Sequence, residues 1–425
     1  MLNTTKIKSD FPIFKNQLNL TYLDSTATSL KPQSVIDKLN EYYTQYSSNI
    51  FRGLYPISQK ATEEHEATRE IVTKFIGAKH PEEVIFTKNT SESLNLLMYT
   101  LGDKIVQKDD NVIISIAEHH SNFVPWQMLC LKKEAEFRVL GINKEGTVKL
   151  DELEQQVDSR TKIIALTYIS NVLGTVNPIE KIVKIAKKKN PNVIIIIDAA
   201  QAAPHLKLEV RKLGADFVAF SSHKMLGPTG VGILWGKKEL FEEMPPFMFG
   251  GEMIEKVSVE KTTFDKLPHK FEAGTPAIGE IIALKEAVKY LEKIGLKNIE
   301  KHEKELTNYA LERLNNEFGN DFQVIGPNDY KLKTGIIAFV FKDYHPHDIA
   351  DILGNQGICI RAGHHCAAPL HEKANISASS RMSFYLYNNQ EDVEKIINGL
   401  KKVDQILKMG FHERSTNSKF KQPCC

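Results

Sequence analysis

Val-Ile-Ile-Ile-Ile-Asp-Ala-Ala-Gln, residues 193–201, is the stretch of sequence that decides the fold. The unbroken aliphatic run from Val193 to Ile197 predicts a strand buried on both faces, because a half-buried strand would alternate with polar residues. The run is far shorter than the ~20 apolar residues that a membrane-spanning helix needs. A carboxylate, Asp198, follows directly at the end of this strand.

Similar apolar runs recur from Leu20 to about Pro276, and helical patterns such as residues 180–189 lie between them. Strands that alternate with helices predict a parallel sheet covered by helices on both faces, the α/β class. Ligands bind beyond the carboxyl ends of such strands, so the residues there are the candidates for a site. The other predicted strands of this sheet are Val84–Phe86, Val112–Ile116, Ile163–Leu166, Phe217–Phe220 and Val231–Leu234.

The length of 425 residues predicts more than one core. We expect an N-terminal arm over residues 1–20 that packs with the small domain, and a large domain over residues 21–276. A smaller α+β C-terminal domain is expected over residues 277–425. Within it, residues 279–294 predict a long helix, and Ile336–Phe341 and Ile358–Ile360 predict strands.

The composition is that of a globular protein, with 42% apolar and 25% charged residues. A formal net charge of +2 argues against a nucleic-acid partner, which would need clustered basic residues. The first residues lack the apolar core of a secretory signal, and no cysteine pair has CxxC spacing, so we expect a reducing cytoplasm and no membrane association. Cys424 and Cys425 resemble a prenylation tail without its usual context, and their role stays open.

Two residues at the ends of predicted strands form a candidate cofactor site. Asp198 ends one strand, and Lys224 follows the next within the Gly/Pro-rich segment 220–232. Desolvation lowers the pKa of a lysine and frees its lone pair for imine formation. A carboxylate for a pyridinium nitrogen together with such a lysine is the minimum equipment of a pyridoxal 5'-phosphate (PLP) site. Either residue alone would more simply be a helix cap or a surface lysine; the pair favours PLP.

Two further segments fit this site. Thr90 and Ser91 follow the strand Val84–Phe86 and open a helix, where backbone N–H groups and hydroxyls suit a phosphate. A plain helix cap is the alternative interpretation. His119 follows another strand, where an imidazole can stack on a pyridine ring and relay protons, although a single histidine there can also be an ordinary core residue.

A second reactive group lies in the segment Cys359-Ile-Arg-Ala-Gly-His-His-Cys366, which we expect to form a loop after a short strand. Arginine and imidazoles around Cys366 make the loop electropositive, which favours a thiolate. Arg361 and Arg381 are candidates for binding an amino-acid carboxylate bidentately. A metal site at His364, His365 and Cys366 is the rival interpretation, but adjacent residues cannot readily fill three positions of one tetrahedron, so we expect no metal.

These motifs resemble the Suf-type cysteine desulfurases of the class-V aminotransferase family. The resemblance runs from Tyr22 to Tyr387, nearly the whole chain, and it includes the Arg-x-Gly-His-His-Cys loop at residues 361–366. It implies a PLP-dependent transferase of fold type I, similar to aspartate aminotransferase, and a homodimer. The other shared motifs are Glu118–Trp126, Ser170–Thr175, Gly227–Gly230, Gly250–Met253 and Phe271–Pro276.

The resemblance also implies a role for each cofactor-binding residue. Lys224 is the Schiff-base lysine, Asp198 holds the pyridinium, His119 stacks on the ring, and Gln201 contacts the phenolic oxygen. The phosphate is bound by Thr90, Ser91, Ser221 and His223, and by Thr275 from the neighbouring subunit.

The substrate and the sulfur have implied binding residues too. Asn171 and Arg381 meet the substrate carboxylate, Arg361 lines the active site, and Cys366 accepts the sulfur. The implied reaction converts L-cysteine to L-alanine, with the sulfur carried as a persulfide on Cys366 to an acceptor protein for iron–sulfur cluster assembly. Selenocysteine lyase or cysteine-sulfinate desulfinase activity on the same site is the alternative. An aminotransferase and a non-enzymatic scaffold are two further interpretations.

The chain departs from the family pattern at several positions. Ser222 stands where the family usually has glycine, Tyr55 where it has histidine, and Ser25 and Thr26 where it has Asn-Ala. Ser91 replaces a threonine but keeps the hydroxyl, so we expect phosphate binding to survive.

Overall fold

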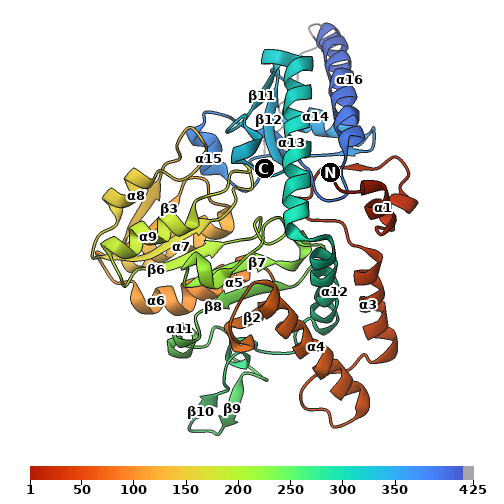
Figure 1. Cartoon of the computed structure of the whole chain (residues 1–425). Coiled ribbons are helices and arrows are strands. Elements are labelled where there is room, and N and C mark those ends of the chain that lie inside the picture. Colours follow the sequence, from red (N-terminus) through yellow and green to blue (C-terminus); the bar gives the residue numbers. More distant parts are fainter. Residues whose placement is uncertain (415–425) are drawn as a thin grey trace.

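A seven-stranded sheet forms the centre of the computed structural model, which describes residues 1–414 (Figure 1). Strands β7, β6, β5, β3 and β4 are parallel to one another, and β8 runs antiparallel to both of its neighbours, β7 and β2. The prediction of a mainly parallel sheet is therefore confirmed. In spatial order the strands are β2 (Val84–Thr87), β8 (Gly232–Gly236), β7 (Phe217–Ser221), β6 (Ile194–Asp198), β5 (Thr161–Thr167), β3 (Asn111–Ser115) and β4 (Glu136–Leu140).

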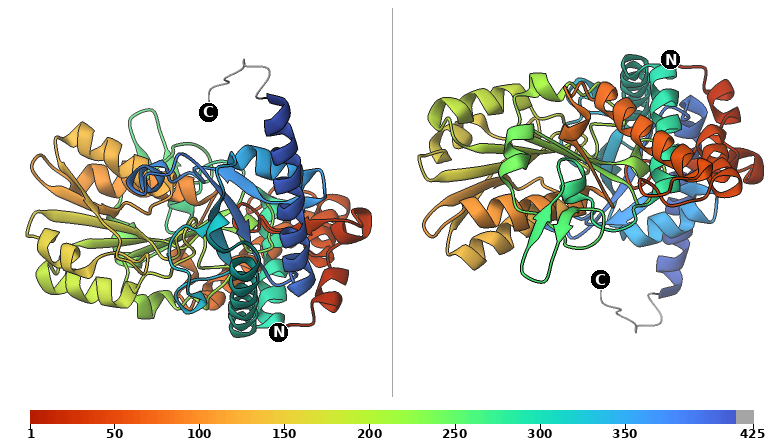
Figure 2. Two further views of the ribbon diagram at one scale, coloured as in Figure 1. Left: turned by 90° about the horizontal axis from the view of Figure 1, so that it is seen from above. Right: turned by 90° about the horizontal axis from the view of Figure 1, so that it is seen from below.

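Helices cover both faces of this sheet, as the two views in Figure 2 show. Successive strand residues point to opposite faces, so Ile195 and Ile197 of β6 enter one hydrophobic cluster while Ile196 enters another. The cluster of Ile195 and Ile197 includes residues of α4 (Pro56–Phe75), α9 (Ile179–Lys189) and α12 (Ile278–Ile294). The cluster of Ile196 includes residues of α5 (Thr90–Leu97), α7 (His120–Lys133) and α11 (Lys238–Glu243).

A second, four-stranded antiparallel sheet lies in the C-terminal part of the chain. Its strands in spatial order are β11 (Phe322–Val324), β12 (Ile336–Phe341), β15 (Ser379–Ser383) and β14 (Arg361–Gly363). Helices α13 (Leu296–Phe318), α14 (Pro346–Gly354) and α16 (Gln390–Arg414) lie beside it. The segment from Arg361 to Gly363 was expected in a loop and is instead a strand, because it pairs with β15.

The N-terminal segment reaches this C-terminal sheet. Strand β1 (Thr21–Tyr22) pairs in parallel with β13 (Ile358–Cys359), and Asp24 forms a bridge with Ser383. Residues just after the predicted arm thus join the C-terminal part of the chain. The domain limits at residues 20 and 276 stay a prediction.

The remaining elements are short or lie at the periphery. None of the helices in residues 1–414 combines the length and the apolar character that spanning a bilayer requires. Cys424 and Cys425 lie outside the described residues. The remaining α-helices and strands of the described residues are α1 (Thr4–Ser9), α2 (Ile13–Asn16), α3 (Gln33–Gln45), α6 (Asp103–Ile105), α8 (Leu150–Gln156), α10 (Val210–Leu213), α15 (Ala368–Lys373), β9 (Ile254–Val257) and β10 (Thr262–Phe264).

Candidate active site

A cavity of about 300 Å³ lies at the carboxyl ends of β5, β6 and β7 and is closed by residues of the C-terminal sheet. Its wall contains every residue predicted for the site except Thr275. Thr275 is exposed and lines a separate, smaller cavity of about 150 Å³ beside residues 86–88. The residues brought together are Thr90, Ser91, His119, Asn171, Asp198, Gln201, Ser221, His223, Lys224, Arg361, Cys366 and Arg381.

Asp198 and Lys224 face the same cavity from neighbouring strand ends. Burial lowers the pKa of Lys224 from 10.5 to about 8, although the charge of Asp198 opposes the shift. Burial raises the pKa of Asp198, while the N–H of Ala200, which donates to its carboxylate at 2.9 Å, and the charge of Lys224 both lower it. A desolvated amine and a buried carboxylate are thus available to one ligand.

Hydroxyl groups gather where helix α5 begins. Asn89 caps this helix, and the Thr90 N–H donates to the Ser221 hydroxyl at 2.9 Å. The hydroxyls of Thr90 and Ser221 are 2.6 Å apart, and those of Ser91 and Ser121 are also 2.6 Å apart. These groups come from three separate segments and line the cavity at the positive end of the helix dipole, which suits an anion.

His119 is the N-cap of α7 and presents a neutral imidazole to the cavity. Its Nδ1 accepts a hydrogen bond from the Ser121 N–H at 3.1 Å, so the ring proton of the neutral form lies on Nε2. Burial, followed by the charge of Lys224, lowers the pKa of His119 to about 3. The imidazole is therefore uncharged at neutral pH and can lie against an aromatic ring.

Two arginines oppose each other on adjacent strands. Arg361 of β14 and Arg381 of β15 are paired in register, an arrangement in which like charges repel unless an anion lies between them. Arg381 is buried, and burial lowers its pKa to about 10. Its Nη1 donates to the carbonyl of Asn171 at 2.9 Å and its Nη2 to Asp24 at 3.3 Å, whereas its Nε is buried and has no hydrogen-bond partner within residues 1–414. The pair fits a carboxylate ligand.

Cys366 is exposed at the mouth of the cavity in a constrained loop. His365 and Cys366 both have left-handed backbones, with φ of 52° and 56°, which costs roughly 1–2 kcal/mol for each. Hydrogen bonds hold this shape: the carbonyl of Cys366 accepts from the His120 N–H at 2.7 Å, and that of His365 from the Asn171 side chain at 2.7 Å.

The His365 ring is turned into the protein. Its Nε2 lies 2.9 Å from the hydroxyl of Ser379, and the same hydroxyl lies 2.9 Å from Nε2 of His371. Burial lowers the pKa of His365 to about 2. Residues 1–414 contain no group of three or more His, Cys, Asp or Glu side chains arranged to hold a metal.

Sequence reasoning missed the segment that supports Lys224. The carbonyl of His223, one residue before Lys224, accepts hydrogen bonds from the Ser29 N–H, the Thr28 and Ser29 hydroxyls and Lys31 Nζ, at 2.9–3.1 Å. No local sequence pattern predicts these hydrogen bonds, because they join positions almost two hundred residues apart. Ser121 was also missed, although it follows directly on His119 and His120.

The departure at Ser222 is accommodated by the backbone. Ser222 lies in a 3₁₀ turn, Ser222–Lys224, and its φ is negative, so glycine is not required there. Tyr55 is exposed and lies away from the cavity wall, with its hydroxyl 3.0 Å from that of Ser48.

The donor set of the cavity fits PLP. A carboxylate, a desolvated amine, hydroxyls at a helix start and a neutral imidazole meet the needs of a phosphorylated pyridine aldehyde. Two further wall residues, Gln201 and Thr26, each have a buried side-chain oxygen, Oε1 and Oγ1 respectively, that has no hydrogen-bond partner in the described part of the chain. Buried polar atoms are usually hydrogen-bonded, so these two suit a polar ligand. Fold and site together define a PLP-dependent enzyme of fold type I.

The family model described as aminotransferase class-V matches residues 21–396, and the chain belongs to this family. A relative from Halalkalibacterium halodurans named "Probable cysteine desulfurase" is 44% identical over 407 residues, which cover 95% of this chain and 98% of the relative.

Two solved structures agree with this assignment. The apo structure of a cysteine desulfurase from Thermococcus onnurineus has a TM-score of 0.90 and 39% identity, and covers 95% of this chain and 98% of its own. The cysteine desulfurase CsdA from Escherichia coli has a TM-score of 0.87 and 31% identity, with coverages of 96% and 99%. The predicted family, fold class, enzyme class and PLP cofactor are confirmed. The Suf-type subclass stays a prediction.

Proposed function

We propose that this chain converts L-cysteine to L-alanine and receives the sulfur on Cys366. The observation that carries the proposal is that one cavity wall holds the amine of Lys224, the carboxylate of Asp198 and the thiol of Cys366. These groups lie far apart in the sequence, and an aminotransferase would need only the first two. The thiol therefore favours desulfuration over amino-group transfer.

The chain's own residues have distinct tasks around the cofactor. Bound PLP supplies the electron sink that weakens bonds to the substrate's Cα and Cβ. Lys224 holds the cofactor and, as a neutral amine, takes the proton from Cα. Asp198 keeps the pyridinium protonated, and His119 covers the ring and relays a proton. Gln201 and the phosphate-binding set Thr90, Ser91, Ser221 and His223 fix the orientation.

Substrate binding and sulfur transfer use a second set of residues in the cavity wall. Arg381, Arg361 and Asn171 bind the substrate carboxylate, which relieves the repulsion between the two opposed guanidinium groups. The Cys366 thiolate then attacks the substrate sulfur: an S–S bond forms, the Cβ–S bond breaks, and its electron pair stays on carbon. Protonation of that carbon yields alanine and leaves a persulfide on Cys366.

The acceptor of this sulfur is a carrier protein for iron–sulfur cluster assembly. The exposure of Cys366 supports this step, because a second protein's thiol can reach its sulfur. Cys130, Cys359 and Cys366 are all free thiols, which supports the cytoplasm as the location.

The working enzyme is a homodimer in which Thr275 serves the phosphate site of the other subunit. The Gly274 N–H, next to Thr275, donates to the carbonyl of Gly251, and Arg52 forms an ion pair with Glu252. The segments around these residues carry exposed apolar side chains, Leu54, Tyr55, Ile57 and Phe249. Exposed apolar side chains of this kind are common in interfaces.

The test compares Cys366→Ala with Cys359→Ala, a matched change of a thiol outside the cavity wall. We expect Cys366→Ala to keep the absorbance of the lysine-bound cofactor and to lose sulfide and alanine release from cysteine, while Cys359→Ala keeps both. Full activity of Cys366→Ala would remove this thiol from the mechanism. If Cys366→Ala loses cysteine activity but retains selenocysteine or cysteine-sulfinate activity, the alternative chemistry also belongs to this site.

A further inference from the structure

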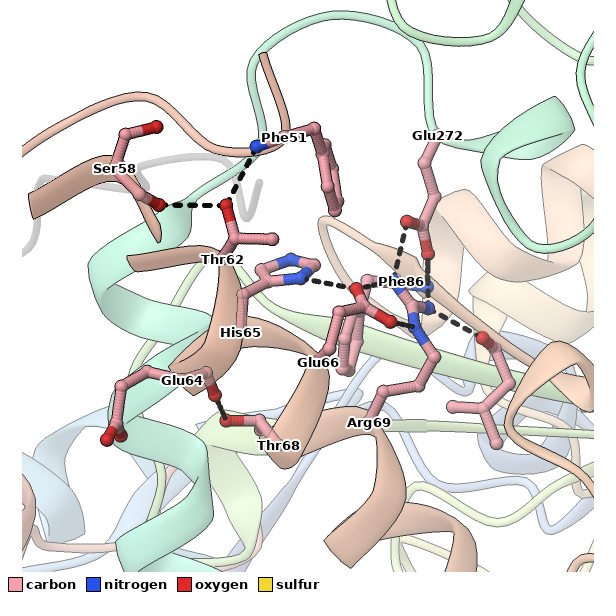
Figure 3. Close-up of polar contacts among 11 residues, drawn as sticks. Phe51, Ser58, Thr62, Glu64, His65, Glu66, Thr68, Arg69, Phe86 and Glu272 are labelled. Carbon is pink, nitrogen blue, oxygen red and sulfur yellow. Dashed lines mark hydrogen bonds and ion pairs between the residues drawn. The ribbon is translucent and has the colours of Figure 1, made fainter. Parts of the chain in front are cut away.

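Arg69 is a buried cation whose five N–H groups all have partners (Figure 3). Nη1 and Nη2 donate to the two carboxylate oxygens of Glu272 at 2.7 and 2.8 Å, and Nη1 also donates to the carbonyl of Val84 at 2.8 Å. Nε and Nη2 form longer bonds of 3.3 Å to Glu66. The guanidinium also lies 4.5 Å from the ring centre of Phe86. Because the pair is bidentate, it fixes the orientation of the Glu272 carboxylate relative to the Arg69 guanidinium.

The pair joins three segments of the chain. Arg69 and Glu66 belong to α4, Val84 and Phe86 to the edge strand β2, and Glu272 follows a 3₁₀ turn. Glu272 Oε1 also accepts the N–H of Phe86 at 2.7 Å. One carboxylate is thus bonded to a helix and to the central sheet, which fixes its own segment against both.

After Glu272 the chain passes from the buried ion pair to the protein surface. The side chain of Glu272 is 8% exposed, whereas Gly274 and Thr275 are exposed. Gly274 has a left-handed φ of 80°, and a Cβ at this position would meet no atom within 4 Å. The position of Thr275 is therefore set by the buried carboxylate three residues before it, together with the hydrogen bond from the Gly274 N–H to the carbonyl of Gly251 at 3.0 Å.

We propose that the Arg69–Glu272 pair positions Thr275 for the cofactor phosphate of a second copy of the chain. The inference rests on the proposed homodimer and adds two positioning residues that touch neither cofactor nor substrate. Neither Arg69 nor Glu272 lines the cavity of its own subunit. The effect that the pair has through Thr275 falls on the other subunit.

The variants that test this role are Glu272→Gln and a matched control, Glu66→Gln. Both remove one carboxylate from the same guanidinium, but Glu66 has no connection to the Thr275 segment and makes the longer bonds. We expect the dissociation constant of PLP to rise about tenfold to hundredfold in Glu272→Gln. This is the effect of losing one hydrogen bond to a charged group, here the bond from a misplaced Thr275 to the cofactor phosphate. Glu66→Gln should leave it within about twofold.

Mixed dimers separate an effect on the neighbour from an effect on the altered subunit itself. Lys224→Ala leaves one lysine-bearing site per mixed dimer, so the absorbance of lysine-bound PLP reports that site alone. With Lys224→Ala and Glu272→Gln on one chain, the remaining site belongs to the unaltered chain and receives Thr275 from the altered one. With the two changes on opposite chains, the remaining site receives Thr275 from a chain with an intact pair.

The expected result is weak PLP binding in the first mixed dimer and normal binding in the second. Equal weakening in both, or weakening in the second alone, would overturn the positioning role. Thr275→Ala in the same two arrangements leaves the buried pair intact and should reproduce the asymmetry. If the chain is a monomer by light scattering, or if Thr275→Ala has no effect in either arrangement, the proposed dimer site itself fails.

Discussion

We expect the protonation of Lys224, the proposed cofactor-binding lysine, to control how fast the apoprotein captures PLP, because only a neutral amine attacks an aldehyde. Burial lowers the pKa of Lys224 from 10.5 to about 8. At pH 7 about one lysine in ten is then neutral, against about 3 in 10,000 for an ordinary lysine. We therefore expect the environment of this one side chain to accelerate capture about 300-fold at neutral pH.

The change Asp198→Asn tests whether burial, rather than a neighbouring charge, causes the lowered pKa of Lys224. The carboxylate of Asp198 raises the pKa of Lys224 by stabilising the ammonium, and it acts against burial. Its removal should lower the pKa further, so the midpoint of the capture rate must move to lower pH than in the unaltered chain. The bound state should nevertheless be weaker, because the pyridinium loses its buried partner.

The assay is stopped-flow absorbance of PLP mixed with apoprotein between pH 6 and 10. Ionisation of free PLP contributes equally to both proteins, so the shift between their midpoints isolates the lysine. Lys224→Ala must abolish capture. Lys333→Met is the matched control, since Lys333 is also buried with a lowered pKa but lies outside the cavity wall, and it must leave the midpoint unchanged. A midpoint near 10 in the unaltered chain, or an upward shift in Asp198→Asn, would refute the reasoning.

Two further predictions concern Arg381 and Lys333. Arg381→Lys loses the guanidinium fork, so the KM for cysteine should rise about tenfold to hundredfold with normal PLP content; an unchanged KM would place the carboxylate elsewhere. Burial lowers the pKa of Lys333 from 10.5 to about 7, so the folded chain binds fewer protons than the unfolded chain between these values and its stability should rise with pH there. Lys333→Met should reduce this slope, and its free energy of unfolding in urea at pH 7 should be about 4 kcal/mol higher; equal slopes would contradict the assignment.

Local sequence patterns predicted the elements whose environment is uniform along their length. The aliphatic run at 193–197 became β6, the pattern at 180–189 became α9, and residues 279–294 fall within α12. Strand β15, Ser-Ser-Arg-Met-Ser, was not predicted, because its polar residues are buried only through pairing with β12 and β14. Edge strand β4 was missed for a related reason: its mixed residues Glu136–Leu140 are mostly half-buried or exposed.

The predicted site residues other than Thr275 were brought together in one cavity, but their arrangement was not predictable. Nothing in the sequence showed that Arg361 and Arg381 stand opposite each other, since strand register is set by pairing across the sheet. The sequence likewise could not predict the four hydrogen bonds to the carbonyl of His223 or the ion pair between Arg69 and Glu272.

By itself the sequence determined the α/β class and supplied the candidate carboxylate, amine and thiol of the site, because these depend on short-range pattern and on residue chemistry. The tertiary structure alone decided the pKa of Lys224, the opposition of the two arginines and the placement of Thr275 outside its own cavity. The physical reason is that desolvation, strand register and long-range hydrogen bonds arise only when segments hundreds of residues apart come into contact.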